Sequence, residues 1–208
     1  MGFAASLHSL SLADAFRASA LRTPGRVALA AGGEVLSYAD LLRPQPGRKH
    51  ASPTAVWLAG VMAQPRGGED RTAAVLRDGV MSHRETALRA LDNIVEHAAY
   101  DRDATLVCTL APDTRNAVVA ATIALWLGGT LRLEPPGAPA AVLEGIAAGS
   151  LHTWWLGRSD AGVLEASFAT LPAPSPQFRL AVLAEEVPAA TRACLAGWLG
   201  EARLREAA

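Results

Sequence analysis

The sequence has few of the residues that build disulfide frameworks and metal centres. Its two cysteines, Cys108 and Cys194, lack CxxC spacing, and its five histidines show no HxH or HExxH spacing. We therefore expect neither a disulfide nor a metal site. Both cysteines lie in apolar segments, which predicts two buried free thiols in a reducing compartment.

An excess of charge and long apolar runs are missing too. The formal net charge is −1, so there is no electrostatic reason to expect nucleic acid or an anionic membrane as a partner. The longest apolar stretch, residues 116–129, is too short to span a bilayer. The N-terminus has no basic segment followed by an apolar run, as a signal peptide would. We expect a soluble, cytoplasmic protein with no membrane span.

The sequence has enough apolar residues to fold: 50% of its 208 residues are hydrophobic and 19% are charged. Near the N-terminus, Ser11 is placed to cap a helix. Residues 26–42 predict a strand, a turn at Gly32 and Gly33, a second strand and a helix that starts at Ser37. Residues 43–71 predict loops around one apolar run.

From residue 104 onward, apolar strands alternate with helical patterns. The predicted strands are residues 104–111, 130–135, 152–157 and 178–186, and the predicted helices are residues 114–129, 138–150, 158–172 and 188–204. This alternation indicates right-handed βαβ crossovers and a parallel sheet. We predict two portions: a small N-terminal helix–hairpin portion, residues 1–71, which covers one face, and an α/β portion, residues 72–208.

The order of these segments resembles that of the adenylate-forming superfamily, which includes acyl-CoA synthetases and peptide-synthetase adenylation domains. Residues 12–42 resemble its opening, and "GVMSHRE", residues 79–85, resembles the segment that follows its phosphate loop. Residues 125–166 and 178–204 resemble its acyl-pocket region. The resemblance implies an α/β fold like the N-terminal acyl-pocket subdomain, with a parallel sheet and flanking helices.

The sequence departs from the family where ATP is bound. The family's phosphate loop is rich in Thr, Ser and Gly and ends in Pro-Lys-Gly, because backbone N–H groups and a lysine hold the phosphates. Here residues 71–80 read "RTAAVLRDGV", with no lysine and with Asp78 at the lysine's place. A carboxylate there repels a triphosphate.

Other parts of the family's catalytic equipment are also absent from the sequence. Its adenine-binding motif and C-terminal domain would follow Arg205, and residues 111–118 replace its aromatic-His segment. We expect no ATP-dependent ligase activity and no cofactor. Whether other enzymatic activity remains is open.

Residues 82–85 form the first candidate site. Ser82 and Glu85 have the spacing of a capping box at a helix start. That leaves His83 and Arg84 as candidates for binding a ligand or partner.

The second candidate, Asp113 and Arg115, follows the first parallel strand, where open α/β sheets bind ligands. Asp113 or Thr114 could instead cap the next helix. Arg115 at a helix N-terminus opposes the helix dipole, unless a carboxylate or a bound anion lies nearby.

Two further pairs concern the expected acyl pocket. Trp154 and Trp155 are adjacent on a strand and point to opposite faces. One belongs to the core; the other lies under a helix or in the pocket wall, and Trp155 is our candidate for ligand contact. Glu185 and Glu186 replace a Gly-Gly pair of the family's pocket floor and would obstruct an acyl or aryl group. Adjacent acids can act in acid–base catalysis, although in a turn they are usually solvated.

Three functions follow from these features. The first is a non-catalytic accessory protein that binds an acyl carrier protein, a synthase or a complete ligase in a lipid or natural-product pathway, with an acyl or aryl small molecule as a further ligand. The second is a repurposed enzyme acting on acyl or aryl thioesters through His83, Asp113 and Glu185. The third is half of a split ligase, against which the lost phosphate loop argues. Uncovered apolar surface and free strand edges also predict a homodimer or an obligate partner.

Overall fold

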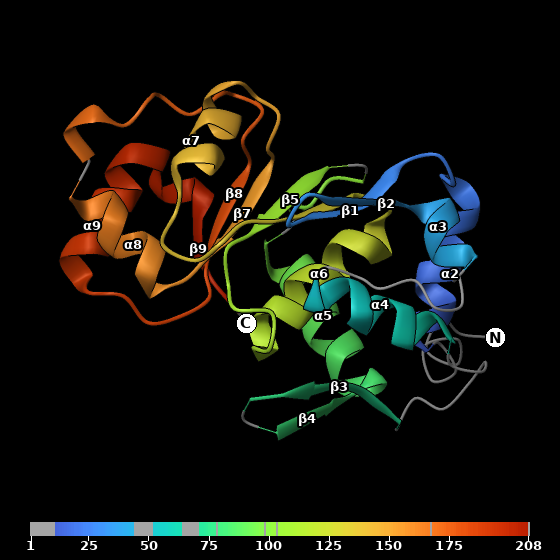
Figure 1. Cartoon of the computed structure of the whole chain (residues 1–208). Helices are drawn as coiled ribbons and strands as arrows, with labels where there is room; N and C mark the ends of the chain where they lie inside the picture. The colour runs from blue at the N-terminus through green and yellow to red at the C-terminus, as the bar shows by residue number, and fades with distance from the viewer. Residues whose placement is uncertain are drawn as a thin grey trace.

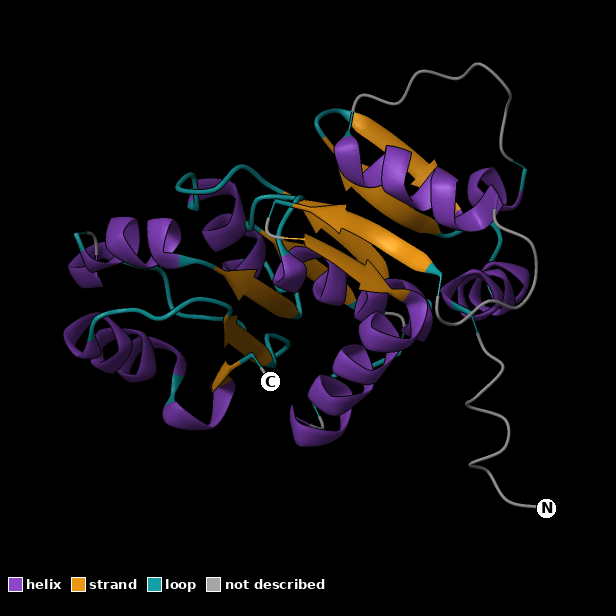
Figure 2. Ribbon diagram, turned by 90° about the horizontal axis from the view of Figure 1, so that it is seen from below, coloured by secondary structure: helices purple, strands orange, loops and turns teal. Residues whose placement is uncertain are grey.

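A seven-stranded, mostly parallel sheet forms the centre of the molecule, and helices cover both of its faces (Figures 1 and 2). The computed structural model describes residues 11–43, 52–63, 71–77, 79–97, 99–102, 104–166 and 168–207. The strands are β1 (Val27–Ala31), β2 (Glu34–Ser37), β3 (Thr72–Leu76), β4 (Gly79–Ser82), β5 (Thr105–Cys108), β6 (Thr130–Leu133), β7 (Thr153–Leu156), β8 (Leu180–Leu183) and β9 (Leu204–Glu206). The helices are α2 (Leu12–Arg22), α3 (Tyr38–Leu42), α4 (Pro53–Ala63), α5 (His83–His97), α6 (Arg115–Leu127), α7 (Ala140–Ala147), α8 (Arg158–Glu165) and α9 (Ala189–Leu199), with short 3-10 turns at Phe168–Thr170 and Glu201–Arg203.

The strand order places β5 at the point where the chain changes direction. The order is β2-β1-β6-β5-β7-β8-β9, so β6 and β7 flank β5 on opposite sides. Only the pair β1–β2 is antiparallel in this sheet. The predicted α/β class with a mostly parallel sheet is therefore confirmed. In open sheets of this kind, ligands bind beyond the carboxyl ends of the strands at such a switch point.

The N-terminal helix and hairpin form where the sequence predicts them. Ser11 caps α2 and Ser37 caps α3, each by accepting a backbone N–H of the first turn. Gly32 and Gly33 have φ of 56° and 81°, which suits the turn between β1 and β2. The prediction that this hairpin covers a face is wrong, because β1 pairs with β6 and the hairpin extends the sheet. The division at residue 71 stays a prediction.

Three segments differ from the predicted elements. The apolar run expected among loops forms helix α4. The helix predicted over residues 158–172 ends at Glu165 and is followed by a 3-10 turn. The last predicted helix ends at Leu199 and is followed by Gly200, whose φ is 86°. After a 3-10 turn the chain forms β9, parallel to β8. Within the described part of the chain, no helix is both long enough and apolar enough to cross a membrane.

The sheet separates two apolar cores. One lies under α2, α4 and α6, and the other under α7, α8 and α9. Trp154 and Trp155 enter opposite cores and neither has exposed surface. Cys108 is buried as predicted, but Cys194 is exposed, because it lies on the outer side of α9.

A second, two-stranded sheet lies apart from the main one, at the bottom of Figure 1. In it β3 and β4 are antiparallel and contact α5. Leu76 pairs with Gly79, so residues 77 and 78 alone connect the strands. The side chains of Ala74, Leu76 and Met81 are buried.

Candidate functional site

The β3–β4 hairpin occupies the place where the sequence resemblance puts a phosphate loop. A phosphate loop needs several successive N–H groups that converge on one anion. Here the strands are paired up to Leu76 and Gly79, so their backbone groups are engaged in hydrogen bonds between the two strands. Asp78, which aligns with the family's lysine, lies outside the described residues. The described backbone at this point forms a tight hairpin.

An ion pair joins the hairpin to the segment after β5. The guanidinium of Arg77 donates to both carboxylate oxygens of Asp113, with Nε–Oδ2 and Nη2–Oδ1 distances of 3.2 and 2.9 Å. The Arg77 backbone N–H also donates to the Asp113 carbonyl oxygen, at 3.1 Å. A bidentate pair of this kind fixes orientation as well as distance. Asp113 is therefore held by the hairpin, while Thr114 caps α6 through the N–H of Ala117.

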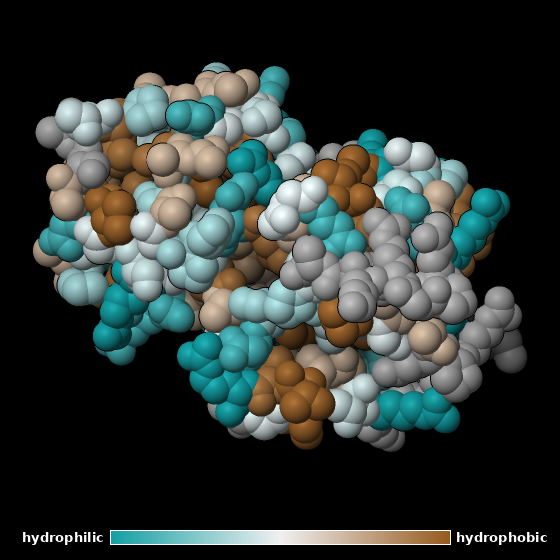
Figure 3. Space-filling view, in the orientation of Figure 1, coloured by the Kyte–Doolittle hydropathy of each residue, from teal (hydrophilic) through white to brown (hydrophobic). Residues whose placement is uncertain are grey.

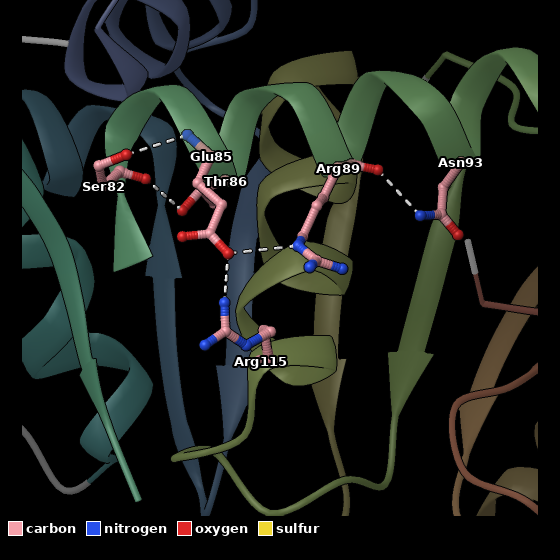
Figure 4. Close-up of polar contacts among 6 residues, drawn as sticks. All are labelled: Ser82, Glu85, Thr86, Arg89, Asn93 and Arg115. Atoms are coloured by element: carbon pink, nitrogen blue, oxygen red, sulfur yellow. Dashed lines mark hydrogen bonds and ion pairs between the residues drawn. The ribbon is translucent and has the colours of Figure 1, made fainter. Parts of the chain in front are cut away.

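A second ion pair joins the start of α5 to the start of α6 (Figure 4). The carboxylate of Glu85 accepts from the guanidinium of Arg115 and, at 3.4 Å, from Arg89. The hydroxyl of Ser82 accepts the N–H of Glu85 at 3.1 Å. Half of the predicted capping box is thus present, but the Glu85 side chain turns to Arg115. The Glu85 carboxylate explains how a cation, Arg115, is accommodated at the N-terminus of α6, where the helix dipole opposes it.

The two candidate segments of the sequence, residues 82–85 and 113–115, are therefore brought together in one place. This region, which we call the hairpin–α6 junction, consists of Arg77, Ser82, Glu85, Asp113 and Arg115. It lies beside the carboxyl end of β5, at the switch point of the sheet. Its charged side chains neutralise one another.

His83 lies next to this junction but faces inward. Its side chain is 1% exposed, and Nδ1 accepts the N–H of Leu12 at the start of α2 at 3.3 Å. Burial, and to a lesser extent the charge of Arg71, lower the pKa of His83 below its usual value. The neutral imidazole thus satisfies a helix N–H, while the adjacent Arg84 is exposed.

Trp155 does not join the junction. Its indole N–H donates to the hydroxyl of Tyr100 at 3.1 Å. Trp154 donates instead to the hydroxyl of Thr109 at 3.0 Å. Both indoles are satisfied inside the protein, and in this structure Trp155 presents no surface to a ligand.

Asp160 is a buried polar residue at the switch point that the sequence prediction missed. Its carboxylate accepts from the Thr109 hydroxyl at 2.6 Å, the Gly137 N–H at 2.9 Å and the Gly157 N–H at 3.2 Å. It has no exposed surface, and burial raises its pKa, which these hydrogen bonds partly oppose. Asp160 therefore ties together the segments that follow β5, β6 and β7. An acid three residues after a strand-ending glycine is the signal that could have found it.

A polar pocket of about 240 Å³ lies beyond the ends of β8 and β9. Glu185 lines it, but its carboxylate accepts the N–H of Arg158 at 2.8 Å. The Arg158 guanidinium donates to the Glu186 carbonyl oxygen, and Arg192 pairs with Glu206 across the pocket. Glu185 and Glu186 are thus parts of a hydrogen-bonded turn, and only one of the two carboxylates is fixed by a backbone donor.

A larger, mainly apolar pocket of about 540 Å³ lies beyond the ends of β1, β6 and β5. The Gly32–Gly33 turn, the start of α4 and the pair Pro135–Pro136 border it. Among the residues that the structure describes, no group of three or more His, Cys, Asp or Glu could hold a metal ion.

Comparison with known proteins gives a match in structure only. No protein-family model and no curated protein matches the chain. The complex of VinN with L-aspartate matches over 96% of this chain and 75% of that one, with a TM-score of 0.69 and 12% identity. The AMPPNP-bound nonribosomal peptide synthetase FmoA3 matches over 94% and 31%, with a TM-score of 0.73 and 17% identity.

O-succinylbenzoate CoA synthetase (MenE) from Bacillus subtilis, in complex with AMP, matches over 87% of this chain and 56% of that one, with a TM-score of 0.66 and 11% identity. All three are adenylate-forming enzymes. The fold of this chain is therefore that of the adenylate-forming enzymes, as its sequence resemblance implies. The chain spans about half of MenE and less than a third of FmoA3.

Proposed function

We propose that this chain is a non-catalytic relative of the adenylate-forming enzymes that acts by binding a protein partner in a lipid or natural-product pathway. The partner is an acyl carrier protein, a synthase or a complete ligase. The observation that carries the proposal is the β3–β4 hairpin, whose two-residue connection replaces the phosphate loop. A paired backbone cannot offer the converging N–H groups that a triphosphate needs.

The charges around the hairpin support the same conclusion. The nearest described cations of the hairpin–α6 junction, Arg77 and Arg115, are each paired with a carboxylate. A triphosphate would have to displace Asp113 and Glu85, both of which repel it. The described residues of the junction therefore favour internal neutralisation over nucleotide binding.

The two alternatives have less support. Thioester chemistry through His83, Asp113 and Glu185 needs these groups to act on one substrate, but each is engaged elsewhere: His83 with α2, Asp113 with Arg77, and Glu185 with Arg158. A split ligase would still need a phosphate loop within residues 71–80. No contact among the described residues supports either alternative.

Nucleotide binding tests the proposal directly. We expect isothermal titration with Mg²⁺ and AMPPNP to give no heat of binding, with FmoA3 as the positive control. A Kd tighter than about 1 mM would contradict the proposal. Pyrophosphate exchange and turnover of acyl thioesters are both expected to stay at the level of a protein-free control, and turnover lost on Asp113→Ala would favour the repurposed enzyme.

A further inference from the structure

The outer face of the β3–β4 hairpin is apolar and exposed. Val75 and Val80 are directly opposite each other across the two strands, and they are 79% and 58% exposed. Figure 3 shows a hydrophobic patch over the hairpin at the bottom of the molecule, with hydrophilic residues on either side. A lone two-stranded sheet is only marginally stable without a covering layer, and here only its inner face is covered by the chain.

The rim of this face is positively charged. Residues 71–89 together with their ion-pair partners Asp113 and Arg115 contain five arginines against three acids, Asp78, Glu85 and Asp113, so positive charge remains in excess here in a chain whose net charge is −1. Arg71 precedes β3, Arg77 follows it, and Arg84 follows β4; all three are exposed. Arg77 keeps 68% of its side chain exposed although it pairs with Asp113. The rim therefore attracts an acidic surface.

The charge of the rim also decides between two possible occupants of this face, a second copy of this chain and an acidic protein. In a twofold dimer through this face, each arginine-bearing rim would meet its own copy, and like charges would oppose each other. An acidic partner that places an apolar side chain over Val75 and Val80 meets no such repulsion. It would also bury the valine pair, which accounts for apolar residues at these exposed positions.

We infer that the outer face of the β3–β4 hairpin, formed by Val75 and Val80 and bordered by Arg71, Arg77 and Arg84, is the docking surface for an acidic protein partner. The inference rests on the proposed function and names the surface that serves it. Among the partners proposed above, we take an acyl carrier protein with an acidic surface as the occupant.

The test is a titration of the full chain with a purified acyl carrier protein. We expect a micromolar Kd that weakens at least tenfold from low to high salt, because exposed charges are screened. The double variants Val75→Ser/Val80→Ser and Arg71→Glu/Arg84→Glu should each weaken binding at least tenfold. Val35→Ser and Arg102→Glu change exposed residues of the same types on other surfaces and should leave the Kd unchanged.

The outcomes separate the surface from the function. If the carrier protein binds the wild type and both double variants equally, the surface is wrong and the proposed function stands. If it does not bind the wild type at all, the inferred occupant is wrong, whereas the proposed function, which also includes a synthase or a complete ligase as partner, is tested separately by the nucleotide titration. A wild-type dimer by light scattering that Val75→Ser/Val80→Ser converts to a monomer would assign the face to a second copy. Thermal melts confirm that each variant is folded, and the charge variants test the surface without altering the apolar pair.

Discussion

Arg115, the first residue of α6, forms an ion pair with Glu85 in the first turn of α5. The two side chains are 30 residues apart in sequence and about one-third exposed. The pair places a carboxylate beside a helix N-terminus, where the helix dipole favours it. It also joins the segment after the hairpin to the segment after β5, so it helps to hold the hairpin–α6 junction together.

We expect the Glu85–Arg115 pair to contribute about 1 kcal/mol to the free energy of unfolding, the upper end for a partly exposed pair. A double-mutant cycle of Glu85→Gln and Arg115→Gln, followed by urea unfolding, measures this coupling. Arg89→Gln is the matched control, because Arg89 also contacts Glu85 but at 3.4 Å and with a more exposed side chain. Additive effects of the two glutamine substitutions would contradict the prediction.

Stability should decrease as the pH falls below about 6.5. Burial lowers the pKa of both His83 and His97, so below the unfolded value the unfolded chain binds protons that the native chain does not. The free energy of unfolding therefore falls with pH, by up to about 1 kcal/mol for each histidine between pH 7.5 and 5.5. Urea unfolding at a series of pH values measures this loss.

Of the two histidines, His97 is the better position for a substitution that tests this pH dependence. It is 8% exposed, and neither ring nitrogen has a hydrogen-bond partner in the described part of the chain. Replacing it with leucine should therefore flatten the pH dependence without removing a hydrogen bond. The histidine explanation is wrong if His97→Leu and His83→Gln both leave the slope unchanged.

Asp160→Asn should lower the free energy of unfolding by about 2 kcal/mol, although the side chain keeps its size. Both carboxylate oxygens accept hydrogen bonds. In asparagine an NH₂ group replaces one of these oxygens, so a donor must face another donor. Thermal or urea unfolding measures the loss. Glu185→Gln, which alters an exposed acceptor beyond the carboxyl end of β8, is the control and should change stability by less than about 0.5 kcal/mol.

The two cysteines should react at very different rates. Cys108 is fully buried, and burial raises its pKa to about 12, whereas Cys194 is exposed. Only the thiolate reacts with disulfide reagents, so we expect one thiol per chain to be labelled rapidly under native conditions and the second only after unfolding. Cys194→Ser should abolish the rapid phase. A rapid phase that persists in this variant would show that Cys108 is accessible.

The local features of the fold could be predicted from the sequence. Ser11 and Ser37 cap their helices and the Gly32–Gly33 turn forms as expected, because these structures depend on side chains within a few residues of one another. The alternation of strands and helices after residue 104 predicted the parallel sheet, because the apolar pattern of each strand and helix is also set by residues close together in the sequence. The order of segments also carried the resemblance that the solved structures bear out at the level of the fold.

The candidate site was predicted less completely. The sequence marked residues 82–85 and 113–115 as separate candidates, and it noted that Arg115 needed a nearby carboxylate or anion. It could not show that Glu85 supplies that carboxylate, nor that Arg77 holds Asp113, because both contacts cross more than 29 residues. Asp160 was missed because its three donors come from three different segments.

By itself, therefore, the sequence determined the class of fold, the starts of α2 and α3, the Gly32–Gly33 turn, and the absence of a Thr-, Ser- and Gly-rich segment with a lysine at residues 71–80. The tertiary structure alone decided that this segment closes into a hairpin tied to α6, and that Glu85 pairs with Arg115 instead of completing a cap on Ser82. It also decided that His83 is buried while Val75 and Val80 are exposed. Local propensities act over one turn or one strand, whereas ion pairs and burial depend on which distant segments the packed sheet brings together.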